Sequence, residues 1–122
     1  MTDEFEKIKQ LFEELIAQPE IKFPPRRKSL EAPRARGVYI IRRGQKVLHV
    51  GSTPRGKNGL HQRLRNHLDG ISEFARVFLS GDGNRLRIGH TYQCLVVPNK
   101  RPRALLEHYA IGVLCPAHLG DG

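Results

Sequence analysis

Apolar residues recur at helical spacing near both ends of the chain and in its middle. The segment from Asp3 to Ala17 has this spacing with acidic residues around it, and Thr2 can cap the helix that it predicts. Leucines at every fourth position from Leu60 to Leu68 predict a short amphipathic helix. Further apolar residues predict a helix over 71–79 and a last helix with Pro102 in its first turn.

Two short segments alternate instead in the manner of β-strands, at 37–39 and 47–51. The residues Arg43-Gly44-Gln45 between them supply the turn of a tight hairpin. With these three residues as the loop, position 42 faces position 46, and Tyr39 lies opposite His49. A phenol and an imidazole would then be ~5 Å apart on one face of a two-stranded ribbon. Such a pair indicates a site rather than a core.

A third strand is predicted from Gly89 to Val97, where Pro98 ends it. The order of elements is then helix, strand, strand, helix, helix, strand, helix. This order predicts a small mixed α/β domain of the α+β class, an antiparallel three-stranded sheet flanked by helices, with an extra helix at the N-terminus. We divide the chain into an acidic helix with a basic, proline-rich connector (1–36) and the domain that holds the sheet (37–122).

Two polar residues lie beside the leucine stripe of the helix over 60–68. Arg63 and His67 each precede a leucine of the stripe, so both can lean over the neighbouring sheet. In the last predicted helix, Glu107 is the only carboxylate between Asp82 and Asp121. An isolated acid in a basic and apolar stretch indicates a specific role.

Taken together, these motifs resemble those of the GIY-YIG nuclease domains. That family is named for two strand motifs, which Gly37-Val38-Tyr39 matches fully and His49-Val50-Gly51 matches with one change. It has an arginine and, four residues later, a histidine or tyrosine on the first helix, matched by Arg63 and His67. A metal-binding glutamate on a later helix is matched by Glu107. The resemblance covers roughly residues 37 to 119.

The resemblance implies a metal-dependent endonuclease that hydrolyses DNA phosphodiester bonds through a single divalent ion. Glu107 would hold one Mg²⁺ or Mn²⁺, since a carboxylate is a hard oxygen ligand. Arg63 would bind phosphate oxygens with its planar fork. His67, Tyr39 and His49 are the candidates for proton transfer, and a histidine is expected to titrate near neutrality, whereas a tyrosine is not.

Two departures from the family pattern leave an alternative open. His49 replaces the second tyrosine, and Leu119 stands three residues after Pro116, where the family often has an asparagine. The choice of Arg63 over Arg65 depends on its four-residue spacing to His67. The alternative is a catalytically inactive module that binds nucleic acid and retains the GIY-YIG fold.

Each candidate residue also has a purely structural alternative. Tyr39 could be a strand aromatic with its hydroxyl at the surface, and His49 a tolerated substitution. Arg63 and His67 could be solvated helix residues. Glu107 could form an exposed ion pair with Arg103, one turn earlier, which would contribute little to stability.

The charge of the chain favours a polyanionic partner. The net charge is +9 and the pI is near 10.2. Residues 1–20 hold six acids and two lysines, a net charge of −4, which leaves +13 for the rest. With the resemblance, this predicts DNA, duplex or branched, as the partner. The candidate nucleic-acid-binding residues are Arg55, Lys57, Arg65, Lys100 and Arg101.

Other features of the sequence bound the environment of the protein. The N-terminal helix could pack on the domain, mediate self-association, or cover a basic surface until DNA displaces it. No apolar stretch approaches the ~20 residues of a membrane span and no secretory signal is present, so we expect a cytoplasmic protein without a membrane partner. Cys94 and Cys115 have no Cys-x-x-Cys spacing and are expected to be buried free thiols.

Overall fold

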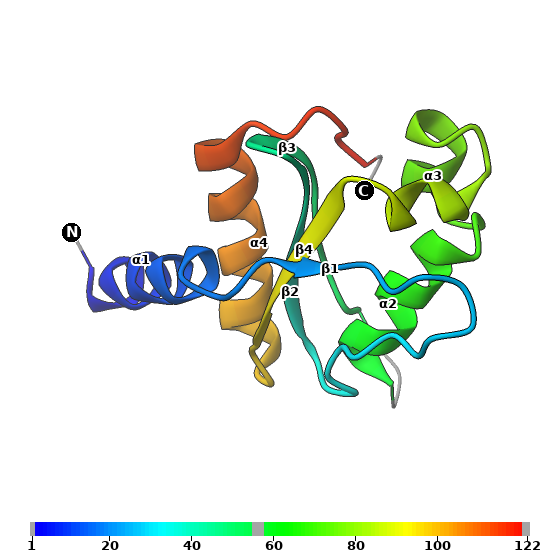
Figure 1. The fold of residues 1–122 in the computed structure, drawn as a ribbon. Coiled ribbons are helices and arrows are strands. Elements are labelled where there is room, and N and C mark those ends of the chain that lie inside the picture. Colours follow the sequence, from blue (N-terminus) through cyan, green and yellow to red (C-terminus); the bar gives the residue numbers. More distant parts are fainter. Residues whose placement is uncertain (1, 55–57, 121–122) are drawn as a thin grey trace.

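The computed structural model describes residues 2–54 and 58–120, and Figure 1 labels its helices and strands. The elements follow the predicted order, with a two-residue strand and a short 3₁₀-helix in addition. In chain order they are α1 (Asp3–Ile16), β1 (Ile21–Lys22), β2 (Gly37–Arg43), β3 (Lys46–Ser52), α2 (Gly59–Leu68), α3 (Glu73–Phe78), the 3₁₀-helix η1 (Gly83–Arg87), β4 (His90–Val96) and α4 (Lys100–Leu114).

Four strands form one antiparallel sheet in the order β1-β4-β2-β3. The α+β class and the flanking helices are confirmed, but the predicted number of three strands is wrong. The additional strand β1 pairs Ile21 with Tyr92 and Lys22 with Thr91 of β4. Two residues in a proline-rich connector give no alternating pattern, so the sequence does not reveal this strand.

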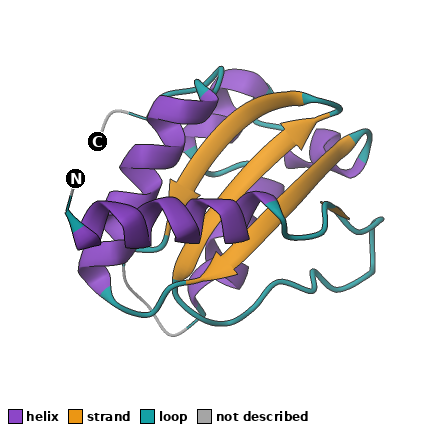
Figure 2. Cartoon of the chain, turned by 90° about the vertical axis from the view of Figure 1, so that its left-hand side faces the viewer, coloured by secondary structure: helices purple, strands orange, loops and turns teal. Residues whose placement is uncertain are grey.

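The sheet lies between two layers of helices, with α1 and α4 on one side and α2 and α3 on the other (Figure 1). Figure 2 shows α1 crossing in front of the three long strands. Side chains of β2 alternate between the layers. Val38 and Ile40 enter the core of α1 and α4, whereas Tyr39 and Ile41 enter the core on the side of α2 and α3. Strand β2 is therefore buried on both faces, and β3 is an edge strand.

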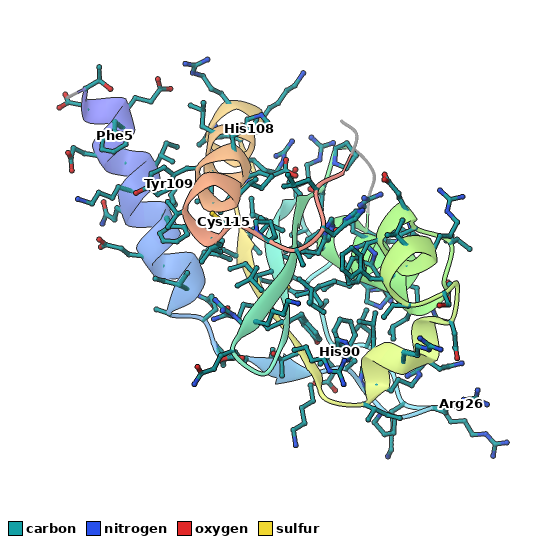
Figure 3. The ribbon with its side chains drawn as sticks, turned by 90° about the horizontal axis from the view of Figure 1, so that it is seen from above. Phe5, Arg26, His90, His108, Tyr109 and Cys115 are labelled. Atoms are coloured by element: carbon teal, nitrogen blue, oxygen red, sulfur yellow. The ribbon has the colours of Figure 1, made fainter. Side chains whose placement is uncertain are left out.

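Helix α1 packs on α4 through its apolar face. Thr2 caps the helix as predicted, because its Oγ1 accepts a hydrogen bond from the backbone N–H of Phe5 at 3.1 Å. The rings of Phe5 and Phe12 meet Tyr109 of α4 edge-on, with centroids 5.9 and 5.3 Å away, and Figure 3 shows Phe5 and Tyr109 on these two helices. Packing of this helix on the domain is confirmed. Self-association through α1 and the division of the chain at residue 36 stay predictions.

The register of the β2–β3 hairpin differs from the predicted one. The turn holds two residues, 44 and 45, instead of three, and a bulge at Leu48 adds one unpaired residue to β3. Tyr39 therefore lies opposite Gly51 and not opposite His49. The shorter turn and the bulge each shift the register by one residue in the same direction. Because the total shift is even, His49 remains on the face of Tyr39, as a diagonal neighbour.

The structure tests two expectations from the sequence, one about the burial of the cysteines and one about membrane-spanning helices. Cys94 of β4 is a free, partly buried thiol, and burial raises its pKa to about 12. Cys115 is also free but exposed, which corrects the expectation of two buried thiols. It follows the last residue of α4 in a left-handed conformation, with φ 48°. No helix within residues 2–54 and 58–120 is long and apolar enough to cross a membrane.

Candidate active site

A pocket of about 850 Å³ lies along the edge strand β3, between α2 and α3 on one side and α4 on the other. Four of the candidate catalytic residues line it: His49, Arg63, His67 and Glu107. The fifth, Tyr39, has no exposed surface and lies beneath them. The structure thus brings together residues that are up to 68 positions apart in the sequence, from Tyr39 to Glu107.

The hydroxyl of Tyr39 lies between two histidines. Its Oη is 2.7 Å from Nε2 of His67 and 3.3 Å from Nε2 of His49. The alternative of a surface hydroxyl is therefore excluded. His67 is 1% exposed and His49 is 8% exposed, so neither is a solvated side chain. All three rings belong to one buried polar network on the α2 and α3 side of the sheet.

Gly51 leaves the space that the Tyr39 ring occupies. A Cβ atom at Gly51 would lie 2.4 Å from Oη of Tyr39 and 2.5 Å from its Cζ. Since the two residues are direct partners across β2 and β3, any side chain at position 51 would displace the ring. The glycine of the second strand motif is thus required by the position of the tyrosine of the first.

Ser72 anchors the other side of His67. Its Oγ lies 2.6 Å from Nδ1 of His67 and accepts a hydrogen bond from the backbone N–H of Ala75 at 3.1 Å. The serine thus caps α3 and contacts the histidine at the same time. Both nitrogens of His67 have partners, which fixes the ring toward Tyr39.

His49 and His67 are neutral at pH 7. Burial lowers the pKa of His49 to about 3, and the neighbouring charges of His118 and Arg63 act in the same direction. Burial likewise lowers the pKa of His67 well below its ordinary value of 6.5. The expectation that these histidines titrate near neutrality is therefore wrong. The sequence shows their presence but not the loss of water around them.

Tyr39 is also neutral. Burial raises the pKa of its phenol to about 12, although the guanidinium of Arg63 opposes this shift. The Nε atom of Arg63 is buried without a hydrogen-bond partner among the described residues. A buried, unpaired guanidinium nitrogen beside a pocket is a donor available to an anion.

Glu107 faces the pocket from α4. Its Oε1 accepts a hydrogen bond of 2.7 Å from Oγ of Ser52, which orients the carboxylate. The alternative of an ion pair with Arg103 is not what the structure shows. The side chain of Arg103 is buried and donates to the carbonyl oxygens of Val97 and Pro98, at 3.1 and 2.8 Å.

His118 is a site residue that the sequence analysis missed. Its Nδ1 lies 3.1 Å from Nδ1 of His49, and the side chain is 6% exposed. The segment after α4, red in Figure 1, runs over β3 toward α3. It is held there because Ala117 and His118 donate backbone hydrogen bonds to the carbonyl oxygens of Val47 and Leu48. A search of positions 116 to 119 for any polar side chain, rather than for asparagine alone, would have found this residue.

Arg65, Lys100 and Arg101, the candidate nucleic-acid-binding residues that the structure describes, do not line the pocket. Arg55 and Lys57 lie outside the described residues. Arg65 forms an exposed ion pair of 3.1 Å with Asp69, and Arg101 donates two hydrogen bonds to Glu4 of α1. Lys100 begins α4 on the helical face of Glu107, since positions 100, 104, 107 and 111 form one stripe. The predicted role of all five in binding stays a prediction.

The chain has the fold of the GIY-YIG endonuclease domains, which confirms the fold that its motifs implied. The GIY-YIG N-terminal endonuclease domain of UvrC from Thermotoga maritima, bound to its catalytic divalent cation magnesium, matches with a TM-score of 0.56. The sequence identity is 23%, over 98% of this chain and 100% of that domain. Two cation-bound point mutants of that domain match with TM-scores of 0.56 and 0.55, at 23% and 22% identity, over 99% and 98% of this chain and 100% of theirs. No protein-family model and no curated protein matches the sequence.

Proposed function

We propose that the protein is a metal-dependent endonuclease that hydrolyses DNA phosphodiester bonds through a single divalent ion. One observation carries this proposal: the hydroxyl of Tyr39 contacts two buried histidines beneath a pocket that also holds Arg63 and Glu107. The pocket thus combines a proton path, an anion-binding group and a carboxylate. Phosphodiester hydrolysis needs each of these.

Glu107 is the residue that would hold Mg²⁺ or Mn²⁺. Within residues 2–54 and 58–120, no three His, Cys, Asp or Glu side chains are placed to share an ion. A single carboxylate suits Mg²⁺, which keeps several waters and is often held by one or two carboxylates together with substrate phosphates. The hydrogen bond from Ser52 fixes the carboxylate in the pocket, so the donor set fits the ion. When bound, the ion supplies positive charge to a phosphate that gains negative charge.

Tyr39 and His67 provide the proton path in this mechanism. As Tyr39 accepts a proton from the attacking water, it gives its own proton to Nε2 of His67, which is neutral and 2.7 Å away. The water oxygen bonds to phosphorus, the bond to the leaving oxygen breaks, and the leaving oxygen takes a proton from solvent. A neutral phenol relays the proton in this scheme, so it need not ionise at neutral pH.

Arg63 would bind the phosphate and open the path to Tyr39. Its guanidinium is close enough to lower the pKa of Tyr39, and its buried Nε lacks a hydrogen-bond partner among the described residues. A phosphate in the pocket would draw this side chain outward into a two-pronged contact. Water could then reach a hydroxyl that has no exposed surface without substrate.

DNA, duplex or branched, is the partner that this proposal assigns. The cation-bound neighbours are endonuclease domains, and residues 21–122 carry almost all of the basic charge of the chain. A strongly basic domain binds phosphate backbones largely through charge. Lys100, Arg65 and Arg101 are the described candidates for these contacts, together with Arg55 and Lys57.

The complete burial of the Tyr39 hydroxyl favours a second candidate, the inactive module that binds nucleic acid. The two candidates differ in whether DNA is cut. Supercoiled, branched and single-stranded DNA should be incubated with the purified protein in Mg²⁺ and in Mn²⁺. Cutting of any of these substrates supports the nuclease, and salt-dependent binding without cutting supports the module.

Glu107→Gln tests the metal ligand within the same assay. The variant keeps a hydrogen-bond acceptor for Ser52 but removes the negative charge, so we expect cleavage to fall to background while DNA binding persists. Glu14→Gln, on the exposed side of α1, is a matched control that should cut normally. Cleavage by Glu107→Gln at the wild-type rate would contradict the mechanism, and fluorescence anisotropy would verify that both variants bind DNA.

A further inference from the structure

His118 and His49 share a contact that requires a proton on one side only. Their Nδ1 atoms are 3.1 Å apart. A protonated imidazole nitrogen donates a hydrogen bond and a bare one accepts it. One of the two Nδ1 atoms must therefore carry a proton, and the other must not. Which atom carries it decides the tautomer of His49.

Two arrangements of protons satisfy the whole chain of contacts that passes through Tyr39. In the first, every hydrogen bond is donated in the same direction, along the order His118, His49, Tyr39, His67 and Ser72. In the second, every hydrogen bond points the opposite way. A tyrosine has one proton to donate and each neutral histidine has one N–H. In a mixture of the two arrangements, either both histidines donate to the Tyr39 oxygen, which leaves the Tyr39 proton without an acceptor in these contacts, or one contact lacks a proton.

The carboxylate of Glu73 keeps a proton on the outer nitrogen of His118. Its Oε1 lies 3.6 Å from Nε2 of His118, too far for a good hydrogen bond but close enough for electrostatic attraction. A neutral His118 with its proton on Nε2 has a bare Nδ1, which imposes the second arrangement. When His118 carries both protons, Nδ1 donates and imposes the first.

We propose that His118, held by Glu73, is a positioning residue that sets the direction of proton transfer through Tyr39. With both protons on His118, His49 donates to the Tyr39 oxygen, and the Tyr39 proton faces His67 across 2.7 Å. With one proton on His118, the direction reverses and the Tyr39 proton faces His49 across 3.3 Å. The shorter contact provides the better proton acceptor, so doubly protonated His118 is the productive form. The link to catalysis rests on the proposed function.

Charged and titratable groups from every surrounding element lie near this series of hydrogen bonds. Glu73 of α3 stands nearest to His118 as an opposite charge. Around the pocket and Tyr39 lie groups from α2, α4, β3 and β4, namely Arg63, His67, Glu107, His108, His49 and Cys94. Glu73 is the one among them that can stabilise a second proton on His118 by direct contact.

Nitrogen NMR of the full chain, labelled at its histidine rings, reports each tautomer without requiring activity. A stepwise decrease of the pH down to the onset of unfolding should move His49 from Nδ1–H to Nε2–H at the point where His118 gains its second proton. His67 should change in the opposite sense at the same pH. His90 is an internal control, because its Nδ1 faces the carbonyl oxygen of Ile88 at 2.7 Å and must stay protonated.

Two variants separate this role from a structural one. His118→Asn places an amide near the position of Nδ1, so His49 keeps a partner that does not titrate, and the linked tautomer change should disappear. Glu73→Gln, at a partly exposed position, should reduce the fraction of Nε2–H His49 at the pH at which half of the wild-type His49 has changed tautomer. In DNA cleavage with Mg²⁺, the ratio of wild-type to His118→Asn rates should rise as the pH falls.

The outcomes of these measurements are distinct. Fixed tautomers of His49 and His67 in the wild type, or a linked change that persists in His118→Asn, would overturn the proposal. If the linked change occurs and no DNA is cut with any metal, the directional hydrogen-bond chain stands and the proposed nuclease function fails.

Discussion

The two faces of the sheet hold cores of different kinds, although strand β2 contributes side chains to both. On the α1 and α4 face, Val38 and Ile40 of β2 enter a cluster of apolar side chains. On the other face, Tyr39 enters a core whose edge contains three buried histidines, His49, His67 and His118. Alternation along one strand thus separates a region that stabilises the fold from one that can carry chemistry.

The polar face is stable only while its groups keep their partners. A buried polar group without a hydrogen bond costs about 1 to 3 kcal/mol, whereas an apolar side chain has no such requirement. His49 and His67 meet it by remaining neutral and by forming hydrogen bonds with Tyr39. The cores should therefore respond differently to mutation and to pH.

The largest effect should come from Tyr39→Phe, which removes one oxygen atom from the polar face. We expect cleavage to slow by about 10²- to 10⁴-fold, the usual contribution of general acid–base catalysis. Unfolding free energy should fall by only about 1 to 3 kcal/mol, because a partner of His67 is lost. Single-turnover cleavage and urea unfolding on the same preparation measure both quantities. Full activity in this variant would remove Tyr39 from the proton path.

Ile40→Ala makes the reciprocal change on the apolar face. The side chain has no exposed surface, so its truncation should lower the free energy of unfolding by about 2 to 5 kcal/mol. The cleavage rate per folded molecule should stay close to wild type, since Ile40 points away from the pocket. Urea unfolding gives the folded fraction for this correction. A lower corrected rate would show that the two faces are coupled through β2.

Arg63→Lys keeps the positive charge on the polar face but loses the planar fork. We expect the barrier to rise by about 1 to 3 kcal/mol if Arg63 binds two phosphate oxygens. Lys100→Ala serves as the comparison for a charge outside the pocket and should mainly weaken DNA binding. The test is the cleavage rate at saturating DNA. An unchanged rate in Arg63→Lys would show that Arg63 acts through its positive charge and not through the planar fork.

The smallest effect is a pH dependence of stability that only the polar face should produce. His49 and His67 have folded pKa values lowered by burial, so the unfolded chain binds protons that the folded chain refuses. Stability should therefore fall as the pH drops below about 6.5, by about 1 kcal/mol for each histidine between pH 6.5 and pH 5.5. Urea unfolding at these two values would measure it. His49→Phe should reduce the loss, and a wild type equally stable at both values would contradict the buried neutral state.

The sequence predicts those parts of the fold that depend on local pattern. The leucines of α2, the cap at Thr2 and the alternation in β2 each reflect a preference that neighbouring residues determine. Strand β1 depends instead on pairing with β4, which lies far away in the sequence. The bulge at Leu48 depends on the register of β3 against β2. No spacing rule along the chain contains that information.

The candidate site shows the same limit. Arg63 and His67 could be identified because their four-residue spacing places them on one face of a helix, and Glu107 because it is the only carboxylate in its stretch of the sequence. The role of His118 could not, because its contact with His49 depends on the path of the segment after α4 across β3. The lowered pKa values of the histidines could not be predicted either, since they result from the burial that all layers produce together.

The bulge at Leu48 restricts which insertions and deletions this hairpin can accept. Side chains alternate between the faces, so loss or gain of one residue on the turn side of His49 would move that ring to the α4 face and Val50 to the face of Tyr39. A change of two residues would restore the facing. In a population of related sequences, the length between Tyr39 and His49 should therefore vary in even steps, or be compensated by the loss of the bulge.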